Sequence, residues 1–209
     1  MYKKVSNLDI KKAIAVSQHT QRNWDLSKEI PEEDVATIVE AATQCPSKQG
    51  RAFYKVHVIT NRDIIEKIHA KTKGQGIVMK DGKADSQTNS QTLANVLLAF
   101  EKNPDGKAIK GHPVYGDTED FTRRDTDMAV GIAAGYVNVV SSLMGYKTGC
   151  CLCFNGFDVA KDAGIENEVL LLMGVGYAQE GVNRRVHHLD PTYEFNTNRK
   201  QEIPIAHIR

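Results

Sequence analysis

The chain has 209 residues, of which 41% are hydrophobic and 25% are charged, as expected of a globular protein with a sizeable core. Lys and Arg total 27 against 26 Asp and Glu, so the formal net charge is +1 and no nucleic-acid or membrane partner is indicated. No apolar run approaches the roughly 18 residues of a membrane-spanning helix, and the N-terminal residues lack the apolar core of a signal peptide. We therefore expect one cytoplasmic domain over residues 1–209.

The first half of the chain carries helix and strand signals before a long polar stretch. Pro31 suits the first turn of a helix, and the three acidic residues after it favour a helix N-terminus. The β-rich alternation from Phe53 onward indicates a strand. The predicted elements are a helix over residues 8–16, a helix from Pro31 to Pro46, a strand over 53–60, a helix over 63–71 and a loop over 72–91 that leaves room for a short helix before Leu93.

The second half is dominated by one long helix signal between two buried strands, predicted over residues 93–100 and 168–177. The helix, at about 118–144, is apolar on most of its circumference, so either a monomer core or a partner subunit must cover it. Gly131 and Gly135 would permit a second helix to approach closely. Because helices and strands do not alternate regularly, we predict the α+β class.

Of the four cysteines, Cys45, Cys150, Cys151 and Cys153, the last three share one short apolar stretch, where we predict buried small hydrophobic groups in a reducing compartment. His187-His188 suggests a metal site only weakly, because adjacent histidines point in different directions and no carboxylate partner is evident. We expect no bound metal.

Three short polar segments could hold a ligand. The first, His19-Thr20-Gln21-Arg22, places a hydroxyl and basic groups where they could bind a phosphate, or else could complement a helix C-terminus. The second, Pro46-Ser47-Lys48-Gln49, joins a helix to a strand and offers free backbone amides, or is an ordinary turn. In the third, Asn155-Gly156-Phe157, a glycine at a helix start lets backbone amides approach a flat ring.

Together, the order and spacing of these segments resemble the nitroreductase family of FMN-dependent oxidoreductases. The basic first segment precedes an amphipathic helix that ends in Pro-Ser, and a strand follows. Further on, Met144-Gly145-Tyr146-Lys147-Thr148 looks like the glycine turn of the family, and Asn155-Gly156-Phe157 looks like its flavin loop. The stretch 171–177 is similar to the last core strand, which commonly ends in Gly-Tyr. The resemblance covers about residues 8–200.

The resemblance implies a central, mostly antiparallel mixed sheet flanked by helices, in an intertwined homodimer with two FMN sites at the subunit interface. It also implies a lid-like excursion at about 101–119 and a C-terminal arm from about 183. In the family pattern, the phosphate, the ribityl chain and the pyrimidine edge of FMN are held by His19, Thr20 and Arg22, and the ring is contacted from the other subunit by Pro46, Ser47, Lys48 and Gln49. The backbone of Asn155 and Gly156 also contacts the flavin. The polar position before the second strand is Asn89 or Gln91, and a further phosphate contact comes from Arg199 or Lys200.

The implied activity is that of an NAD(P)H-dependent flavin oxidoreductase. A nicotinamide would deliver a hydride to flavin N5, and the reduced flavin would then reduce a nitroaromatic, a quinone or a similar acceptor. Arg22 would stabilise negative charge on the reduced flavin, and no side chain is nominated as a catalytic acid or base. Departures such as Gln18, where many members carry Arg, leave two alternatives open. One is another flavin reaction, namely that of a dehalogenase, dehydrogenase or flavin-fragmenting oxygenase. The other is a non-enzymatic FMN-binding protein.

Overall fold

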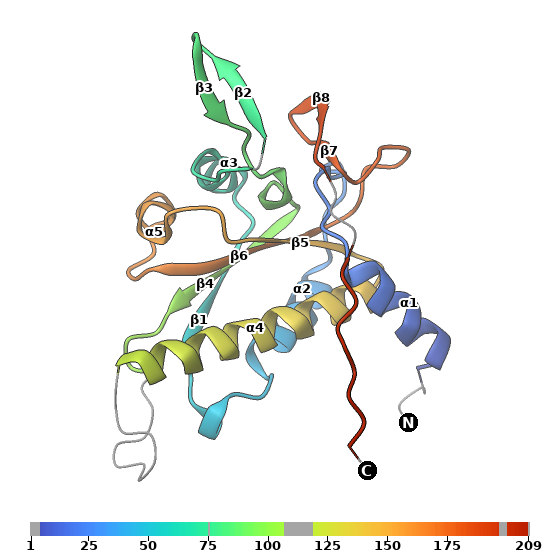
Figure 1. Ribbon diagram of the computed structural model, residues 1–209, viewed down its shortest axis with the longest axis vertical. Helices are drawn as coiled ribbons and strands as arrows, with labels where there is room; N and C mark the ends of the chain where they lie inside the picture. Colours follow the sequence, from blue (N-terminus) through green and yellow to red (C-terminus); the bar gives the residue numbers. More distant parts are fainter. Residues whose placement is uncertain (1–4, 75, 107–118, 197–199, 209) are drawn as a thin grey trace.

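The computed structural model describes residues 5–74, 76–106, 119–196 and 200–208 (Figure 1). Its centre is a four-stranded sheet in which every neighbouring pair is antiparallel. The parallel pairing that a mixed sheet requires is therefore not found among the described strands. The strands lie in the order β1 (Tyr54–Ile59), β4 (Val96–Lys102), β6 (Val169–Gly176) and β5 (Lys147–Cys151).

The two central strands, β4 and β6, confirm the two apolar runs that predicted buried strands. Their sequences, VLLAFEK and VLLLMGVG, are almost continuously apolar, because both faces of the sheet are covered. One buried cluster includes Leu97 and Leu172 and faces α3 and α5, while the other includes Leu98 and Met173 and faces α2 and α4. Strand β5, with the sequence KTGCC, was not predicted, because glycine and cysteine obscure its β signal.

The predicted helices are confirmed to within a few residues. They are α1 (Asn7–Ser17), α2 (Glu32–Thr43), α3 (Arg62–Ala70), α4 (Glu119–Leu143) and α5 (Gly156–Ala163). Figure 1 shows α2 and α4 on one side of the sheet and α3 and α5 on the other. Among the described helices, none combines the length and apolarity needed to cross a membrane.

Helix α4 is covered on one side only. Ala133 and Val137 are fully buried against the sheet. On the opposite side Met128 and Tyr136 are 52% and 45% exposed, and Gly131 and Gly135 are also exposed. A single chain therefore leaves an apolar stripe of this helix uncovered. Most of the predicted 101–119 excursion, residues 107–118, lies outside the described residues.

Two small hairpins were missed by the sequence analysis, which assigned their residues to a loop and to a polar tail. They are β2 (Ile77–Lys80) with β3 (Lys83–Ser86), and β7 (Val186–His187) with β8 (Asp190–Glu194). In the first, Asp81 and Gly82 both have positive φ, 50° and 73°, as a two-residue hairpin turn requires. The Asp-Gly pair was a usable signal, but the polar residues around it masked the strands.

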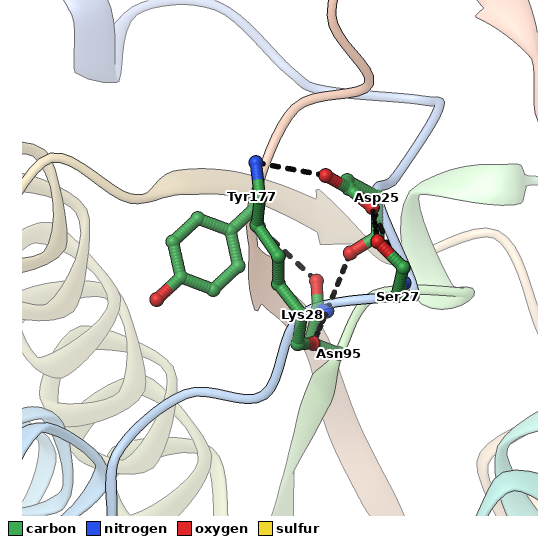
Figure 2. Close-up of polar contacts among 5 residues, drawn as sticks. All are labelled: Asp25, Ser27, Lys28, Asn95 and Tyr177. Carbon is green, nitrogen blue, oxygen red and sulfur yellow. Dashed lines mark hydrogen bonds and ion pairs between the residues drawn. The ribbon is translucent and has the colours of Figure 1, made fainter.

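A polar junction fixes the segment that links the first polar segment to α2 (Figure 2). The Asn95 amide donates to the carbonyls of Asp25 and Lys28, at 2.9 and 2.7 Å, and its oxygen accepts from Tyr177 N at 3.1 Å. Asp25 N donates to Tyr177 O at 2.9 Å. Hydrogen bonds from Ser27 and then Lys28 lower the pKa of Asp25 to about 2. The chain that follows Arg22 is thereby held against the end of β6.

A buried histidine makes stability depend on pH. His69 is 6% exposed, and burial, followed by His187, His188 and Arg62, lowers its pKa to about 4. Between about pH 6.5 and pH 4, His69 is therefore protonated in the unfolded chain and neutral in the folded chain. The contribution of this group to the free energy of unfolding is full above this window and falls as the pH falls through it. We expect a loss on the order of 3 kcal/mol from this group. Urea unfolding across pH should show the slope, and His69→Gln should flatten it.

Candidate functional site

A cavity of about 580 Å³ opens between the end of α1, strand β5 and the β7–β8 hairpin. Its volume lies within the range of small-molecule and cofactor sites. It brings together five residues that were predicted to bind a ligand, His19, Thr20, Arg22, Asn89 and Lys200. The other described lining residues are Gln18, Gly76, Gln91, Cys150, Cys153, Arg184, Tyr193, Phe195 and Asn196.

The first polar segment reaches the cavity because it leaves α1 and crosses beside the sheet. Helix α1 ends at Ser17 with no basic residue in its last turn, and His19 follows the C-cap residue Gln18 directly. Gln21 N donates to Thr148 O at 2.9 Å, and Arg22 N donates to Arg184 O at 3.0 Å. The backbone is thus fixed on both sides, by β5 and by the segment after β6.

The cavity is positively charged. Arg22, Arg184 and Lys200 border it together with His19, and none of the described lining residues is Asp or Glu. The Arg22 guanidinium lies 4.4 Å from the centre of the Phe195 ring, and its Nε is buried without a hydrogen-bond partner. Burial and then Arg184 lower the pKa of Arg22. Arginine nevertheless stays charged at neutral pH. An anion in this cavity would therefore offset both the burial of the Arg22 charge and its repulsion by Arg184.

Gln91 is the described lining residue best suited to a polar ligand contact. Its Nε2 donates to Cys150 O at 3.2 Å, which leaves Oε1 as an acceptor. That oxygen is buried and has no partner, although the residue is only 6% exposed. Asn89, the alternative from the sequence, is occupied instead, since its side chain donates to Lys73 O and its backbone to Thr72 Oγ1.

Arg184 is a lining residue that sequence reasoning missed. Its guanidinium donates to Thr20 O at 3.3 Å, so it touches the first polar segment directly. The adjacent arginines at 184–185 were the available signal, but the sequence alone did not show that the tail turns back at this point. Of the two tail residues that were predicted instead, Arg199 lies outside the described residues, and Lys200 donates to Gln18 Oε1 at 3.0 Å.

The second polar segment lies elsewhere in the single chain. Pro46 and Ser47 border a separate cavity of about 530 Å³, and neither they nor the next two residues line the first cavity. Lys48 forms an ion pair of 2.6 Å with Asp125, and Gln49 adopts a φ of 56°. One chain therefore does not unite the first and second segments.

The third polar segment begins α5 and does not border the cavity. Asn155 Oδ1 accepts from the backbone nitrogens of Phe157 and Asp158, at 3.0 and 3.2 Å, and so caps the helix. Gly156 packs against the backbone of Val169 at the start of β6. Cys153, two residues before the cap, does border the cavity.

Gly156→Ala should destabilise the fold. An added Cβ would overlap the carbonyl oxygen of Val169, which is backbone and cannot move aside cheaply. We expect a loss of about 1–3 kcal/mol in the free energy of unfolding, as for other overpacked sites. Chemical denaturation measures it. Gly131→Ala is the matched control, because a Cβ there meets open space; equal stability of the two variants would contradict the packing argument.

The remaining cysteines and histidines have mixed environments. Cys151 is buried as predicted, but Cys153 is exposed, so the expectation of burial was wrong for that thiol. His187 Nε2 lies 3.1 Å from Thr88 Oγ1, and His188 Nδ1 accepts from Trp24 N at 3.2 Å. Across the described ranges, no three His, Cys, Asp or Glu side chains gather as metal ligands.

The architecture, an antiparallel sheet covered by helices with a cationic cavity beside β5, defines an α+β fold with a cavity of ligand size. The model of the nitroreductase family matches residues 15–177, and the chain belongs to that family. Among curated proteins, none matches the sequence significantly.

Solved structures with the same fold include three whose names describe an activity. An FMN-dependent nitroreductase from Clostridium difficile is 13% identical, with a TM-score of 0.58, over 80% of this chain and 87% of that one. A protein from Staphylococcus epidermidis assigned as an NAD(P)H:FMN oxidoreductase is 17% identical, with a TM-score of 0.61, over 94% and 100%. A gut-bacterial enone reductase of fatty acid saturation is 15% identical, with a TM-score of 0.64, over 93% and 95%. At these identities the likeness establishes the fold.

Proposed function

We propose that this protein is an FMN-dependent NAD(P)H oxidoreductase that reduces a small electron-poor acceptor such as a nitroaromatic, a quinone or an enone. The observation that carries the proposal is the 580 Å³ cavity, which joins Arg22, Arg184 and Lys200 without a described carboxylate. Such a cavity suits a ligand that combines a phosphate with a flat ring. The names of the three structural neighbours support the cofactor and the reaction class.

The residues of the cavity divide the work of holding FMN. The guanidinium groups of Arg22 and Arg184 offer charge-assisted hydrogen bonds to a phosphate, with His19, Thr20 and Lys200 beside them. Gln91 Oε1 supplies an unpaired acceptor for a ring N–H. Satisfying a buried acceptor of this kind is favourable, because leaving it unpaired costs about 1–3 kcal/mol. Asn155 and Gly156 do not border the cavity, so the backbone contact that the family pattern assigns to them stays a prediction.

When bound, FMN would accept a hydride from the nicotinamide and pass the electrons to the acceptor. We assign the side chains of the cavity to binding and orienting the reactants. No described lining residue is a carboxylate, and Arg22 and Arg184 keep the cavity positive, which favours an anionic ligand. The physical contribution of the protein is therefore placement and electrostatics.

A homodimer would complete the site. The single chain exposes apolar groups on α1, on α4 and along the C-terminal residues, where Ile203, Ile205 and Ile208 are 80%, 81% and 98% exposed. An exposed apolar surface of this extent is typical of an interface. In a second subunit, Pro46, Ser47, Lys48 and Gln49 would lie at the cavity of the first. This arrangement accounts for the separation of the two segments within one chain.

The visible spectrum of the purified protein tests the proposal. A flavin absorbance that bleaches with NADH or NADPH under argon, and returns on addition of a quinone or nitroaromatic, is the expected result. Heat release and chromatography should identify FMN and not FAD. FMN that binds but is not bleached would indicate a non-enzymatic carrier. Stoichiometric FAD, or no flavin even after reconstitution, would refute the cofactor assignment.

A further inference from the structure

Two thiols border the cavity, and the proposed reaction uses neither of them. Cys150 lies near the end of β5, and Cys153 lies just beyond it. Between them, Cys151 is 2% exposed and packs in the hydrophobic cluster that faces α3 and α5. The chain thus presents thiols of different accessibility around one ligand-sized space.

Of the two thiols that border the cavity, Cys153 is the more accessible. The residue is exposed, whereas Cys150 is partly buried and Cys151 fully buried. Its backbone is fixed, since Cys153 O accepts from Lys73 N at 2.7 Å. Burial raises the pKa of Cys151 to about 11 and also raises the pKa of Cys150. The neighbouring thiols are therefore poor competitors, because the thiolate is the reactive form.

Other residues of the cavity give independent evidence of a ligand site. Gln91 borders the same cavity, is more than nine-tenths buried, and leaves Oε1 unpaired. Arg22 and Arg184 make the space attractive to anionic molecules. A molecule drawn into this cavity would lie within reach of the Cys153 side chain.

We propose that Cys153 is a covalent modification site for electrophilic acceptors, and that FMN controls it by covering the thiol. The inference rests on the proposed function, since it assigns FMN to this cavity. With FMN in place, an α,β-unsaturated carbonyl compound or a quinone meets the flavin and is reduced. In the apoprotein, the same compound meets the thiol and is trapped.

The trapping step is an addition and needs no outside oxidant or reductant. The Cys153 sulfur forms a bond to the β-carbon of the acceptor, the carbon–carbon π bond breaks, and the thiol proton ends on the α-carbon. With a quinone, the adduct then tautomerises to a hydroquinone thioether. The mass of the protein rises by the full mass of the acceptor.

Peptide mass spectrometry tests the proposal with N-ethylmaleimide and 1,4-benzoquinone as probes. The apoprotein and the FMN-saturated protein are each exposed to the probe, and labelling of Cys45, Cys150, Cys151 and Cys153 is followed with time. We expect Cys153 to label first in the apoprotein. At roughly 100 times the Kd of FMN, which leaves about 1% of sites open, its labelling should slow at least about tenfold. Cys45 borders another cavity and is the internal control for general reactivity.

Cys153→Ser supplies the matched variant. It should lose the benzoquinone adduct at position 153, while Cys45, which borders another cavity, labels at the rate seen in the wild-type protein. FMN binding is measured separately by quenching of flavin fluorescence. If FMN binds and Cys153 labels at an unchanged rate, the inference is overturned while the proposed function stands. If FMN does not bind, the proposed function is refuted, and so is the proposal that FMN covers Cys153. Slower labelling of Cys153 than of Cys45 in the apoprotein would also overturn the inference.

Discussion

Replacing Arg22 with alanine should weaken FMN binding more than tenfold. The guanidinium borders the cavity beside Arg184, and its Nε is buried without a partner. Losing a hydrogen bond from a charged group costs about 1.5–3 kcal/mol, which corresponds to roughly 10- to 150-fold in affinity. The 4.4 Å contact with the Phe195 ring would be lost as well. Titration of the apoprotein with FMN, followed by fluorescence quenching, gives the affinity.

Lys48→Ala is the comparison that makes the Arg22 result specific. The Lys48 ammonium lies 2.6 Å from Asp125, a carboxylate that is 7% exposed, so its positive charge is already compensated within the chain. We expect this variant to lower stability more than FMN affinity. Arg22→Lys keeps a charge without the bidentate fork and should give an intermediate affinity. Equal FMN affinities for Arg22→Ala and Lys48→Ala would contradict our assignment of the phosphate site.

Elements with a simple apolar period could be predicted from the sequence. The recurrence of Val35, Ile38 and Ala42 located α2, and the apolar run around Leu97 located β4, because burial on one or two faces imposes those patterns directly. Strand β5 and the β2–β3 and β7–β8 hairpins escaped notice. Strand β5 contains glycine and cysteine, β3, β7 and β8 are short and mostly polar, and the apolar β2 is only 4 residues long, so pairing with other strands decides their conformation.

The candidate site was predictable where a local motif reaches the cavity by itself. His19, Thr20 and Arg22 lie in the cavity because Gln21 and Arg22 pair with neighbouring backbone. Arg184 could not be placed, because a tail residue reaches the cavity only through the tertiary path of the chain after β6. The choice between Asn89 and Gln91 likewise depended on which amide other groups already occupy. Placement of Pro46–Gln49 at the cavity depends on a second subunit and stays a prediction.

Gly135→Glu should lower dimer content and flavin occupancy together. Gly135 lies on the exposed side of α4, and a Cβ at this position meets no atom within 4 Å in the single chain. The substitution therefore adds bulk and charge at a position where the Cβ meets no clash inside the subunit, and glutamate has a higher helix propensity than glycine by roughly 0.5–1 kcal/mol. We therefore attribute an expected loss of dimer to contacts between subunits. Light scattering and the flavin absorbance of the same sample report both quantities.

Two controls separate the interface from other effects of this change. Gly135→Ala should lower the dimer content less than Gly135→Glu does, because a methyl group is smaller than the glutamate side chain and introduces no charge. Lys161→Glu places a new negative charge on α5, which covers the opposite face of the sheet, and should leave both readouts unchanged. Since the first and second polar segments lie in separate cavities of one chain, a monomer would hold only half of the proposed site. A monomeric wild-type protein with full flavin occupancy would therefore refute the shared site, whereas joint loss of dimer and flavin in Gly135→Glu alone would locate the partner surface on α4.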